Sequence, residues 1–260
     1  MNLNLENKHA LVCGSTQGIG KATAIALALE GVQVTLVARN EDKLKAVLSE
    51  LPHTENHSYI VADFSSPEDL NSKVVSFIKN NHGFHILVNN TGGPKSGTIL
   101  EAAISEFEMA FTQHIKCNHL LAQAVIPFMK TEGFGRIINI ISTSVKEPIA
   151  GLGVSNTIRA AVGNWSKTLA TEVGALGITV NNVLPGFTDT ERIAEITKTK
   201  AKSEGISFEE MSEIMKNYAP AKRFATPNEI ANAVVFLASE AASYINGINL
   251  PVDGGRTKSL

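Results

Sequence analysis

Short runs of consecutive apolar residues recur along the chain, separated by stretches with an apolar residue at every third or fourth position. The runs are rich in Val and Ile, which favours strands, and the stretches between them have the period of an amphipathic helix. The runs predict seven buried strands, at residues 10–13, 32–37, 58–62, 86–89, 135–141, 178–184 and 247–252. The helical spacing predicts helices at residues 18–29, 41–51, 66–80, 105–130, 155–175 and 227–238.

The predicted strands and helices alternate, and the strands are apolar on both of their faces. Strands of this kind form a parallel sheet that helices cover on both sides. The predicted fold class is therefore α/β: a single doubly wound Rossmann fold over residues 1–260, with a mostly seven-stranded parallel sheet. Residues 188–218 are polar and helix-forming, with few large apolar side chains, and we expect them to form a mobile excursion away from the sheet.

Composition and charge exclude several classes of protein. With 260 residues and 43% hydrophobic content, the chain can build one large core. A net charge of −2 without long charged runs argues against nucleic acid or a membrane surface as a partner. The first ten residues are polar and do not form a signal peptide, and no apolar run is long enough to span a bilayer. Cys13 and Cys117 are expected to be buried, reduced thiols of a cytoplasmic protein that has neither a disulfide nor a metal site.

A glycine-rich turn follows the first predicted strand. It reads Gly14-Ser15-Thr16-Gln17-Gly18-Ile19-Gly20, a G-x-x-x-G-x-G spacing, and the first predicted helix begins within it. Glycines let the backbone turn tightly and approach a ligand, and the start of a helix offers unpaired N–H groups and the positive end of its dipole. This context favours a site for the pyrophosphate of a dinucleotide, although an ordinary strand-to-helix connection has the same elements.

Polar residues also follow the other predicted strands, at the point where each strand ends. In an open parallel sheet these ends share one edge, and ligands bind where the strand order reverses. As a set they predict a nucleotide site that, besides the glycine turn, includes Arg39, Asn40, Asp63, Phe64, Asn90, Thr91, Gly92, Pro185, Gly186 and Thr188.

Arg39 indicates which dinucleotide binds. An NAD site places a carboxylate after the second strand to bind the ribose hydroxyls. Here Ala38, Arg39 and Asn40 follow that strand, and the first carboxylate after it is Glu41. A guanidinium suits the 2′-phosphate of NADP instead. The sequence therefore favours NADP(H) over NAD(H), with a solvated arginine at a helix start as the alternative.

Taken together, these segments resemble a classical short-chain dehydrogenase/reductase, most closely the 3-oxoacyl-[acyl-carrier-protein] reductase branch of that family. The resemblance covers essentially the whole chain. Besides the glycine turn, the matching segments are Asp63, Asn89-Asn90-Thr91-Gly92, residues 135–140 leading to Ser142, Pro185-Gly186 and Val252-Asp253-Gly254-Gly255. The resemblance implies an oxidoreductase acting on a small carbonyl or alcohol substrate, with an acyl thioester as one candidate. It also implies contact of Asp63 with adenine, a substrate loop over 188–218, and a homotetramer built through helices 105–130 and 155–175.

The catalytic positions implied by the resemblance depart from the family pattern. The family has a serine, a Tyr-x-x-x-Lys pair and a helix asparagine. The matching positions here hold Ser142, Ser155 with Arg159, and His114. Ser142 and Ser155 are 13 positions apart, which is the family's serine-to-tyrosine gap, and the tyrosine has therefore been substituted.

These substitutions leave the proton donor and the activity open. A serine is a far weaker acid than a phenol, whose pKa is about 10, and an arginine does not release its proton. His114 is the best donor by pKa, because a free imidazole titrates near pH 6.5, with a hydrogen-bonded helix histidine as the alternative. Tyr218 is a weaker candidate. We expect an NADP-dependent oxidoreductase with an altered acid–base site. The alternatives are a dinucleotide-binding homologue with little or no turnover, acting as a sensor or in assembly, and, more weakly, a different reaction on a bound nucleotide.

Overall fold

The computed structural model describes residues 2–259; Met1 and Leu260, the two ends of the predicted domain, lie outside the described residues. Its strands are β1 (His9–Cys13), β2 (Gln33–Ala38), β3 (Ser58–Val61), β4 (Ile86–Asn89), β5 (Gly135–Ile140), β6 (Ile178–Pro185) and β7 (Asn249–Val252). Its α-helices are α1 (Gly18–Leu29), α2 (Glu41–Glu50), α3 (Pro67–Asn80), α4 (Ile104–Phe111), α5 (Cys117–Glu132), α6 (Gly153–Val173), α7 (Glu191–Glu204), α8 (Phe208–Lys216) and α9 (Pro227–Ala238).

The seven strands form one sheet in the order β3-β2-β1-β4-β5-β6-β7, and every neighbouring pair is parallel. The chain adds strands outward from β1 on one side and then, starting with β4, on the other. The strand order therefore reverses between β1 and β4. This arrangement confirms the predicted doubly wound Rossmann fold. Gly14 and Asn90 follow the two strands at the reversal, which is where such sheets bind ligands.

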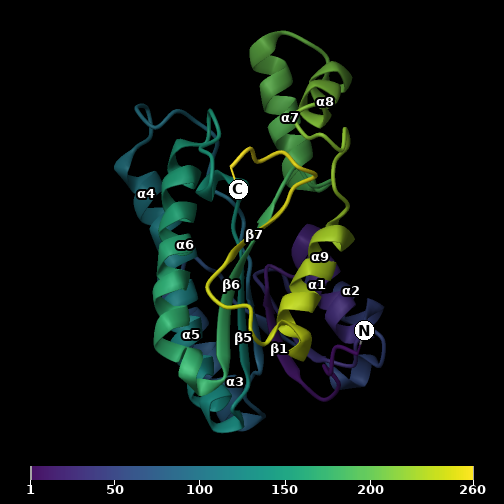
Figure 1. Ribbon diagram of the computed structural model, residues 1–260, viewed down its shortest axis with the longest axis vertical. Coiled ribbons are helices and arrows are strands. Elements are labelled where there is room, and N and C mark those ends of the chain that lie inside the picture. Colours follow the sequence, from purple (N-terminus) through teal and green to yellow (C-terminus); the bar gives the residue numbers. More distant parts are fainter. Residues whose placement is uncertain (1, 260) are drawn as a thin grey trace.

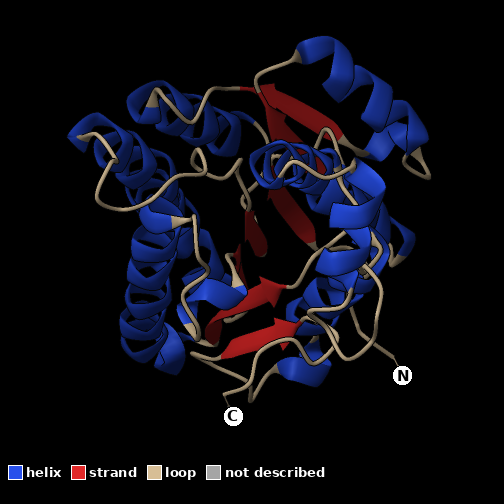
Figure 2. Cartoon of the chain, turned by 90° about the horizontal axis from the view of Figure 1, so that it is seen from above, coloured by secondary structure: helices blue, strands red, loops and turns tan. Residues whose placement is uncertain are grey.

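Helices cover both faces of the sheet (Figures 1 and 2). Helices α1, α2 and α9 lie on one face, and α3, α5 and α6 lie on the other (Figure 1). Successive residues of a strand point to opposite faces, and β1 shows the result. Val12 belongs to the apolar cluster that contains Leu27 and Val234, whereas Leu11 belongs to the cluster that contains Val125. Because both faces are buried, the strands appear in the sequence as continuous apolar runs.

A row of three buried asparagines and one half-buried asparagine crosses four neighbouring strands. Asn89 of β4, Asn139 of β5, Asn182 of β6 and Asn249 of β7 lie at the same level of the register. Each donates from its side-chain amide to the next: Asn89 to Asn139 (2.8 Å), Asn139 to Asn182 (2.9 Å) and Asn182 to Asn249 (2.8 Å). The Asn139 amide nitrogen also lies 2.9 Å from the Ser166 hydroxyl, which joins α6 to the sheet. We call this row the asparagine ladder.

The helix predicted over residues 105–130 is helical throughout, but not α-helical throughout. Helix α4 ends at Phe111, a π-helical segment spans Thr112–Lys116, and α5 begins at Cys117. A π-helical turn holds an extra residue, and such turns occur frequently at functional sites. His114 lies within this segment.

Residues 188–218, which we call the lid, stand away from the sheet as helices α7 and α8 (Figure 1). The lid has a small apolar cluster of its own, formed by Ile193, Ala201, Met211 and Met215. This cluster explains how a segment with few large apolar residues still folds into two packed helices. The mobility of the lid and its role toward a substrate stay predictions.

Candidate active site

The glycine turn lies against Asn90 at the point where the strand order reverses. Gly14 and Gly18 have φ values of +58° and +53°, a left-handed backbone that favours glycine. The Asn90 side-chain amide donates to the Gly14 carbonyl oxygen (3.2 Å), and a Cβ on Gly20 would collide with that same oxygen. Helix α1 begins after Gln17 with no side-chain cap and no acidic residue in its first turn. Its first N–H groups are therefore available to an anion such as a phosphate.

The other residues of the turn have different surroundings. Ser15 is fully buried, and both its backbone N–H and its hydroxyl lie 3.4 Å from the Val37 carbonyl oxygen, which joins the turn to β2. Thr16 is half-buried, and Gln17 and Ile19 line the pocket described below. Ser15 therefore shapes the turn, whereas Gln17 and Ile19 face the space that a ligand would enter.

The residues after β2 and β3 also differ in their surroundings. Arg39 is exposed, and its charge contributes to a lowered pKa of Asp63, whose main cause is a hydrogen bond from the Ser65 backbone. The side chains of Asn40 and Phe64 also have structural contacts. Asn40 caps α2 by accepting a hydrogen bond from a backbone N–H (2.9 Å), and Phe64 is buried in the core.

One pocket at the carboxyl edge of the sheet brings predicted residues from distant segments together. Its walls come from the glycine turn, the segment after β4, the end of β5, the start of α6 and the start of the lid. The predicted residues that line it are Gly14, Gln17, Gly18, Ile19, Asn90, Thr91, Gly92, Ser142, Ser155, Arg159, Pro185, Gly186 and Thr188. Those that do not line it are Ser15, Thr16, Gly20, Arg39, Asn40, Asp63, Phe64 and His114.

Three of the four predicted catalytic positions line this pocket. Ser142 follows β5, and its hydroxyl oxygen accepts a hydrogen bond from a backbone N–H (3.1 Å), which leaves its proton free to donate. Ser155 is half-buried in the first turn of α6. Arg159 is 8% exposed, and its Nη1 donates to the Ile140 carbonyl oxygen (2.7 Å). Burial, followed by the charge of Arg192, lowers the pKa of Arg159 to about 10, which leaves it charged at neutral pH.

His114 does not fit the role of a titrating proton donor. It is 2% exposed and lies outside the pocket lining, hydrogen-bonded to the backbone of Gly92. Burial, and then the charge of Arg159, hold the pKa of His114 well below its usual value, so the ring is neutral at pH 7. This environment argues against the expectation that rested on a pKa near neutrality, and the catalytic role of His114 stays a prediction. The alternative, a hydrogen-bonded histidine within the helical stretch, agrees with the structure. Tyr218 is 54% exposed and also lies outside the lining.

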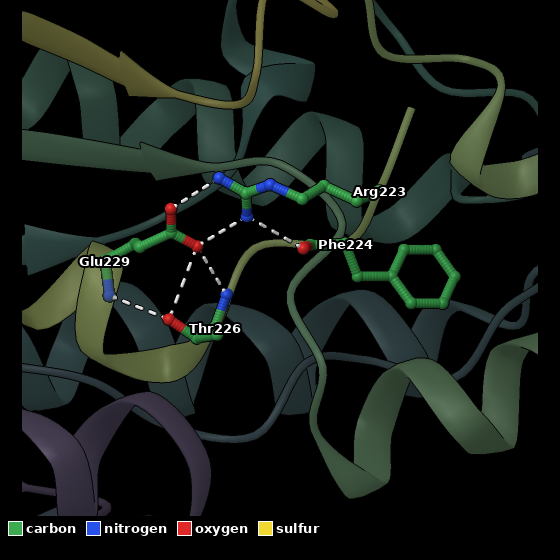
Figure 3. Close-up of polar contacts among 4 residues, drawn as sticks. All are labelled: Arg223, Phe224, Thr226 and Glu229. Carbon is green, nitrogen blue, oxygen red and sulfur yellow. Dashed lines mark hydrogen bonds and ion pairs between the residues drawn. The ribbon is translucent and has the colours of Figure 1, made fainter. Parts of the chain in front are cut away.

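The lid leaves the sheet and returns at one point. Thr188 forms a parallel bridge with Ala225. At the return, Arg223 binds both oxygens of Glu229 (2.7 and 2.6 Å), and Glu229 also accepts from the Thr226 N–H (2.8 Å) in the capping box of α9 (Figure 3). The hydrogen bond from Arg223 is the main cause that lowers the pKa of Glu229 to about 2. The ion pair at the base of the lid is therefore complete at neutral pH.

Two arginines that the sequence did not single out also line the pocket, Arg192 from α7 and Arg256 after β7. The Arg192 Nη2 donates to the Pro94 carbonyl oxygen (2.7 Å). The Arg256 Nη1 lies 2.8 Å from the Thr143 hydroxyl, and its guanidinium stands 4.7 Å from the centre of the Phe187 ring. The sequence marks them only by their position near segments already assigned to the site. Arg192 lies two residues after the segment Pro185–Thr190, and Arg256 directly follows Val252–Gly255.

The chain is similar to known oxidoreductases over nearly its whole length. A family model described as enoyl-(acyl carrier protein) reductase matches residues 14–257. The NADPH-dependent reductase BacG of Bacillus subtilis is 32% identical over 259 residues, which cover 98% of this chain and 100% of BacG. The 3-oxoacyl-[acyl-carrier-protein] reductase FabG of Aquifex aeolicus is 31% identical over 258 residues, 98% of this chain and 99% of that protein. The chain belongs to the short-chain dehydrogenase/reductase family.

Solved structures agree with this membership. L-sorbose reductase from Gluconobacter frateurii, complexed with NADPH and L-sorbose, matches this short-chain dehydrogenase/reductase with a TM-score of 0.93 and 35% identity, and both chains are covered completely. YwfH, an NADPH-dependent reductase involved in bacilysin biosynthesis, has a TM-score of 0.91 and 30% identity over 97% of this chain and 99% of YwfH. The family and the fold expected from the motifs are thus confirmed, whereas the roles of the individual site residues stay predictions.

Further features of this short-chain dehydrogenase/reductase concern metals, membranes and thiols. Within residues 2–259 no group of three or more His, Cys, Asp or Glu side chains could hold a metal ion. No helix in the same range has the length and apolarity needed to cross a bilayer. Cys13 and Cys117 are free and buried, and burial raises the pKa of Cys117 to about 12, so this thiol stays protonated at neutral pH.

Proposed function

We propose that the chain is an NADPH-dependent reductase of carbonyl compounds, similar to 3-oxoacyl-[acyl-carrier-protein] reductases but with an altered acid–base site. The observation that carries this proposal is that Ser142, Ser155 and Arg159 line the same pocket as Gly14 and Gly18 of the glycine turn. The proposal treats residues 1–260 as one NAD(P)-binding domain with the lid as its substrate loop. The similarity to BacG and to the NADPH complex of sorbose reductase supports the choice of cofactor.

The residues present fit such a cofactor. The uncapped start of α1 and the glycine turn would hold its diphosphate. Gly92 lines the pocket, and a Cβ at that position would meet open space, which leaves room for a ligand beside the backbone. Arg39 follows β2 and Asp63 follows β3, and these two strands lie on the other side of β1 from β5, which leads to Ser142. There Arg39 would bind the 2′-phosphate and Asp63 the adenine, while Thr188 would contact the nicotinamide half.

The chain's own residues would carry the acid–base part of the reaction. When bound, NADPH supplies a hydride to the substrate carbon. The free hydroxyl proton of Ser142 would donate a hydrogen bond to the carbonyl oxygen, and Arg159 would stabilise the negative charge that develops there. Neither residue releases a proton at neutral pH. The proton that completes the alcohol would therefore come from water, passed through the hydroxyl of Ser155.

A second function, a dinucleotide-binding homologue with little or no turnover, is favoured by one observation. Arg159 occupies the position of the family's lysine but is held by the Ile140 carbonyl oxygen, and Ser155 is too short to reach where a tyrosine hydroxyl would lie. In that case the intact cofactor residues would serve a sensor or an assembly role.

One experiment separates the two functions. NADPH binding is first confirmed by fluorescence, and NADPH oxidation is then followed by absorbance with 3-oxoacyl thioesters, ketones and quinones. We expect turnover with at least one class of carbonyl compound, and its loss in Ser142→Ala. Binding without turnover across the panel would establish the second function instead.

The substrate class and the assembly are parts of the same proposal. Similarity to FabG makes 3-oxoacyl thioesters the first candidates. A homotetramer is supported by the exposed apolar side chains of Leu100, Ile104, Met109 and Phe111 on and before α4 (93, 73, 60 and 50% exposed), which a second copy would cover. Light scattering would then give the mass of four 27.8-kDa chains. A cytoplasmic location is consistent with the two free thiols.

A further inference from the structure

Three guanidinium groups from separate parts of the chain line the candidate active site. Arg159 comes from α6, Arg192 from α7 in the lid and Arg256 from the segment after β7. Glu191 is the one acidic residue among the described residues of the lining. The pocket therefore has an excess of positive charge, although the whole chain has a net charge of −2.

Arg159 is buried without a counter-ion. Its one hydrogen bond goes to the Ile140 carbonyl oxygen, and its Nε is buried with no partner among residues 2–259. No carboxylate in the described part of the chain forms an ion pair with it. A buried, unpaired charge is costly, and a guanidinium with free donors is suited to a carboxylate or a phosphate. An anionic ligand would supply the missing partner.

Arg192 reaches the same place from the lid. The Nη2 atoms of Arg159 and Arg192 lie 3.8 and 3.9 Å from the point that a Cβ of Gly93 would occupy. The two guanidinium groups therefore approach the same point beside the Gly93 backbone. Besides its hydrogen bond to the Pro94 carbonyl oxygen (2.7 Å), Arg192 makes one ion pair among the described residues, a long contact to Glu195 (3.5 Å), whose side chain is 69% exposed. Two like charges directed at one place without a close carboxylate favour an anion between them.

Arg256 brings a positive charge to the reacting end of the pocket. It is hydrogen-bonded to Thr143, which directly follows Ser142 in the chain, and it stacks over Phe187. These contacts hold the guanidinium near the position at which Ser142 would bind a carbonyl oxygen. Its remaining donors have no side-chain hydrogen bond among the described residues, although the charges of Asp253 and Glu147 also act on this guanidinium.

We propose that the pocket takes a small oxo acid, whose free carboxylate binds Arg192 and Arg256 while its carbonyl oxygen lies at Ser142 and Arg159. The inference rests on the proposed reductase function and specifies its substrate as a free acid rather than a thioester. The same anion chemistry could come from the cofactor diphosphate. The position of the arginines favours the substrate. The diphosphate has the glycine turn and the uncapped start of α1, whereas Arg256 binds Thr143, the residue after Ser142, and lines the same pocket as Ser142.

The test measures binding separately from turnover. Dissociation constants of a panel of free 2-oxo and 3-oxo acids, acetoacetate among them, and of their neutral methyl esters are measured by calorimetry on the complex with NADP+. We expect the acid to bind at least about tenfold more tightly than its ester. Arg256→Gln and Arg192→Gln should each weaken the acid about 10- to 100-fold, the range of a charge-assisted hydrogen bond, and leave NADPH affinity within about twofold. Arg256→Lys, which keeps the charge, should recover part of the loss.

The matched control is Lys198→Gln, which removes the same charge from an exposed position of α7 outside the pocket and should change neither affinity. The inference is overturned if no acid binds more tightly than its ester, or if Arg192→Gln and Arg256→Gln weaken NADPH and leave the acid unaffected, which would assign both arginines to the diphosphate. Turnover of neutral ketones without any preference for acids would overturn the inference and leave the reductase function standing. Arginine-dependent binding of acids without any turnover would support the inference and refute the reductase function.

Discussion

Replacement of Asn139 by leucine would test whether the asparagine ladder holds the sheet and α6 together. Asn139 is fully buried and makes three side-chain hydrogen bonds, to Asn89, Asn182 and Ser166. Each contributes about 1 kcal/mol net, and an orphaned buried donor costs about 1–3 kcal/mol more. The amide of Asn89 would become such a donor, because Asn139 is the one partner that the structure shows for it. We therefore expect Asn139→Leu to lower the free energy of unfolding by about 4–6 kcal/mol.

Urea unfolding followed by circular dichroism measures this loss, and the melting temperature should fall by roughly 10 °C. The control is Ile137→Val, which removes one methyl group from the same buried strand and should cost about 1 kcal/mol. If Asn139→Leu costs no more than this control, the ladder does not contribute through its hydrogen bonds and the reasoning is refuted.

Three further predictions concern the cofactor and pH. Arg39→Asp should raise the Kd of NADPH about 10- to 100-fold and leave that of NADH nearly unchanged, since only the former has the 2′-phosphate; equal effects on both in a fluorescence titration would contradict this role. Gly20→Ala should weaken NADPH at least about tenfold because its Cβ would distort the turn, whereas Gly97→Ala, whose Cβ meets open space, should bind normally in the same titration. Burial is the main cause that lowers the pKa of His85 from 6.5 to about 4 in the folded chain, so the unfolded chain takes up the proton first as the pH falls. Stability should therefore decrease by about 2–3 kcal/mol between pH 7 and 4.5, and His85→Phe should flatten that decrease in urea unfolding; an unchanged slope would refute the assignment.

The sequence could predict the strands, their parallel arrangement and the place of the nucleotide site. Strands that are buried on both faces appear in the sequence as continuous apolar runs. Val12 and Leu11 are both apolar because each packs under a different helical layer. The carboxyl ends of such strands share an edge whatever the side chains are, so Gly14 and Asn90 could be placed together before any geometry was known.

Features that depend on the register between strands, or on contacts between residues distant in the chain, could not be predicted. The asparagines of the ladder appear in the sequence as polar residues within or at the end of apolar runs, and only the alignment of β4 to β7 shows that they form one row. The π-helical segment around His114 does not alter the apolar spacing on either side of it. The depressed pKa of His114 has the same kind of cause, since it follows from burial and from Arg159, which is distant in the chain.

Arg192 and Arg256 were missed for a related reason. A lid helix and a C-terminal segment bring them to the pocket, and nothing in their local sequence distinguishes them from solvated arginines. The role proposed for them depends on a tertiary feature, the burial of Arg159 without a counter-ion among the described residues.

The central claim is that the pocket bearing Ser142, Ser155 and Arg159 transfers hydride from NADPH to a carbonyl carbon. The most direct test incubates the enzyme with NADPH carrying deuterium at the transferred position and an oxo acid, and analyses the product by mass spectrometry. We predict a hydroxy acid with one deuterium on the carbinol carbon, and loss of this product in Ser142→Ala. An unlabelled hydroxy acid, or no product from any acid or neutral carbonyl compound although NADPH is bound, would contradict the claim.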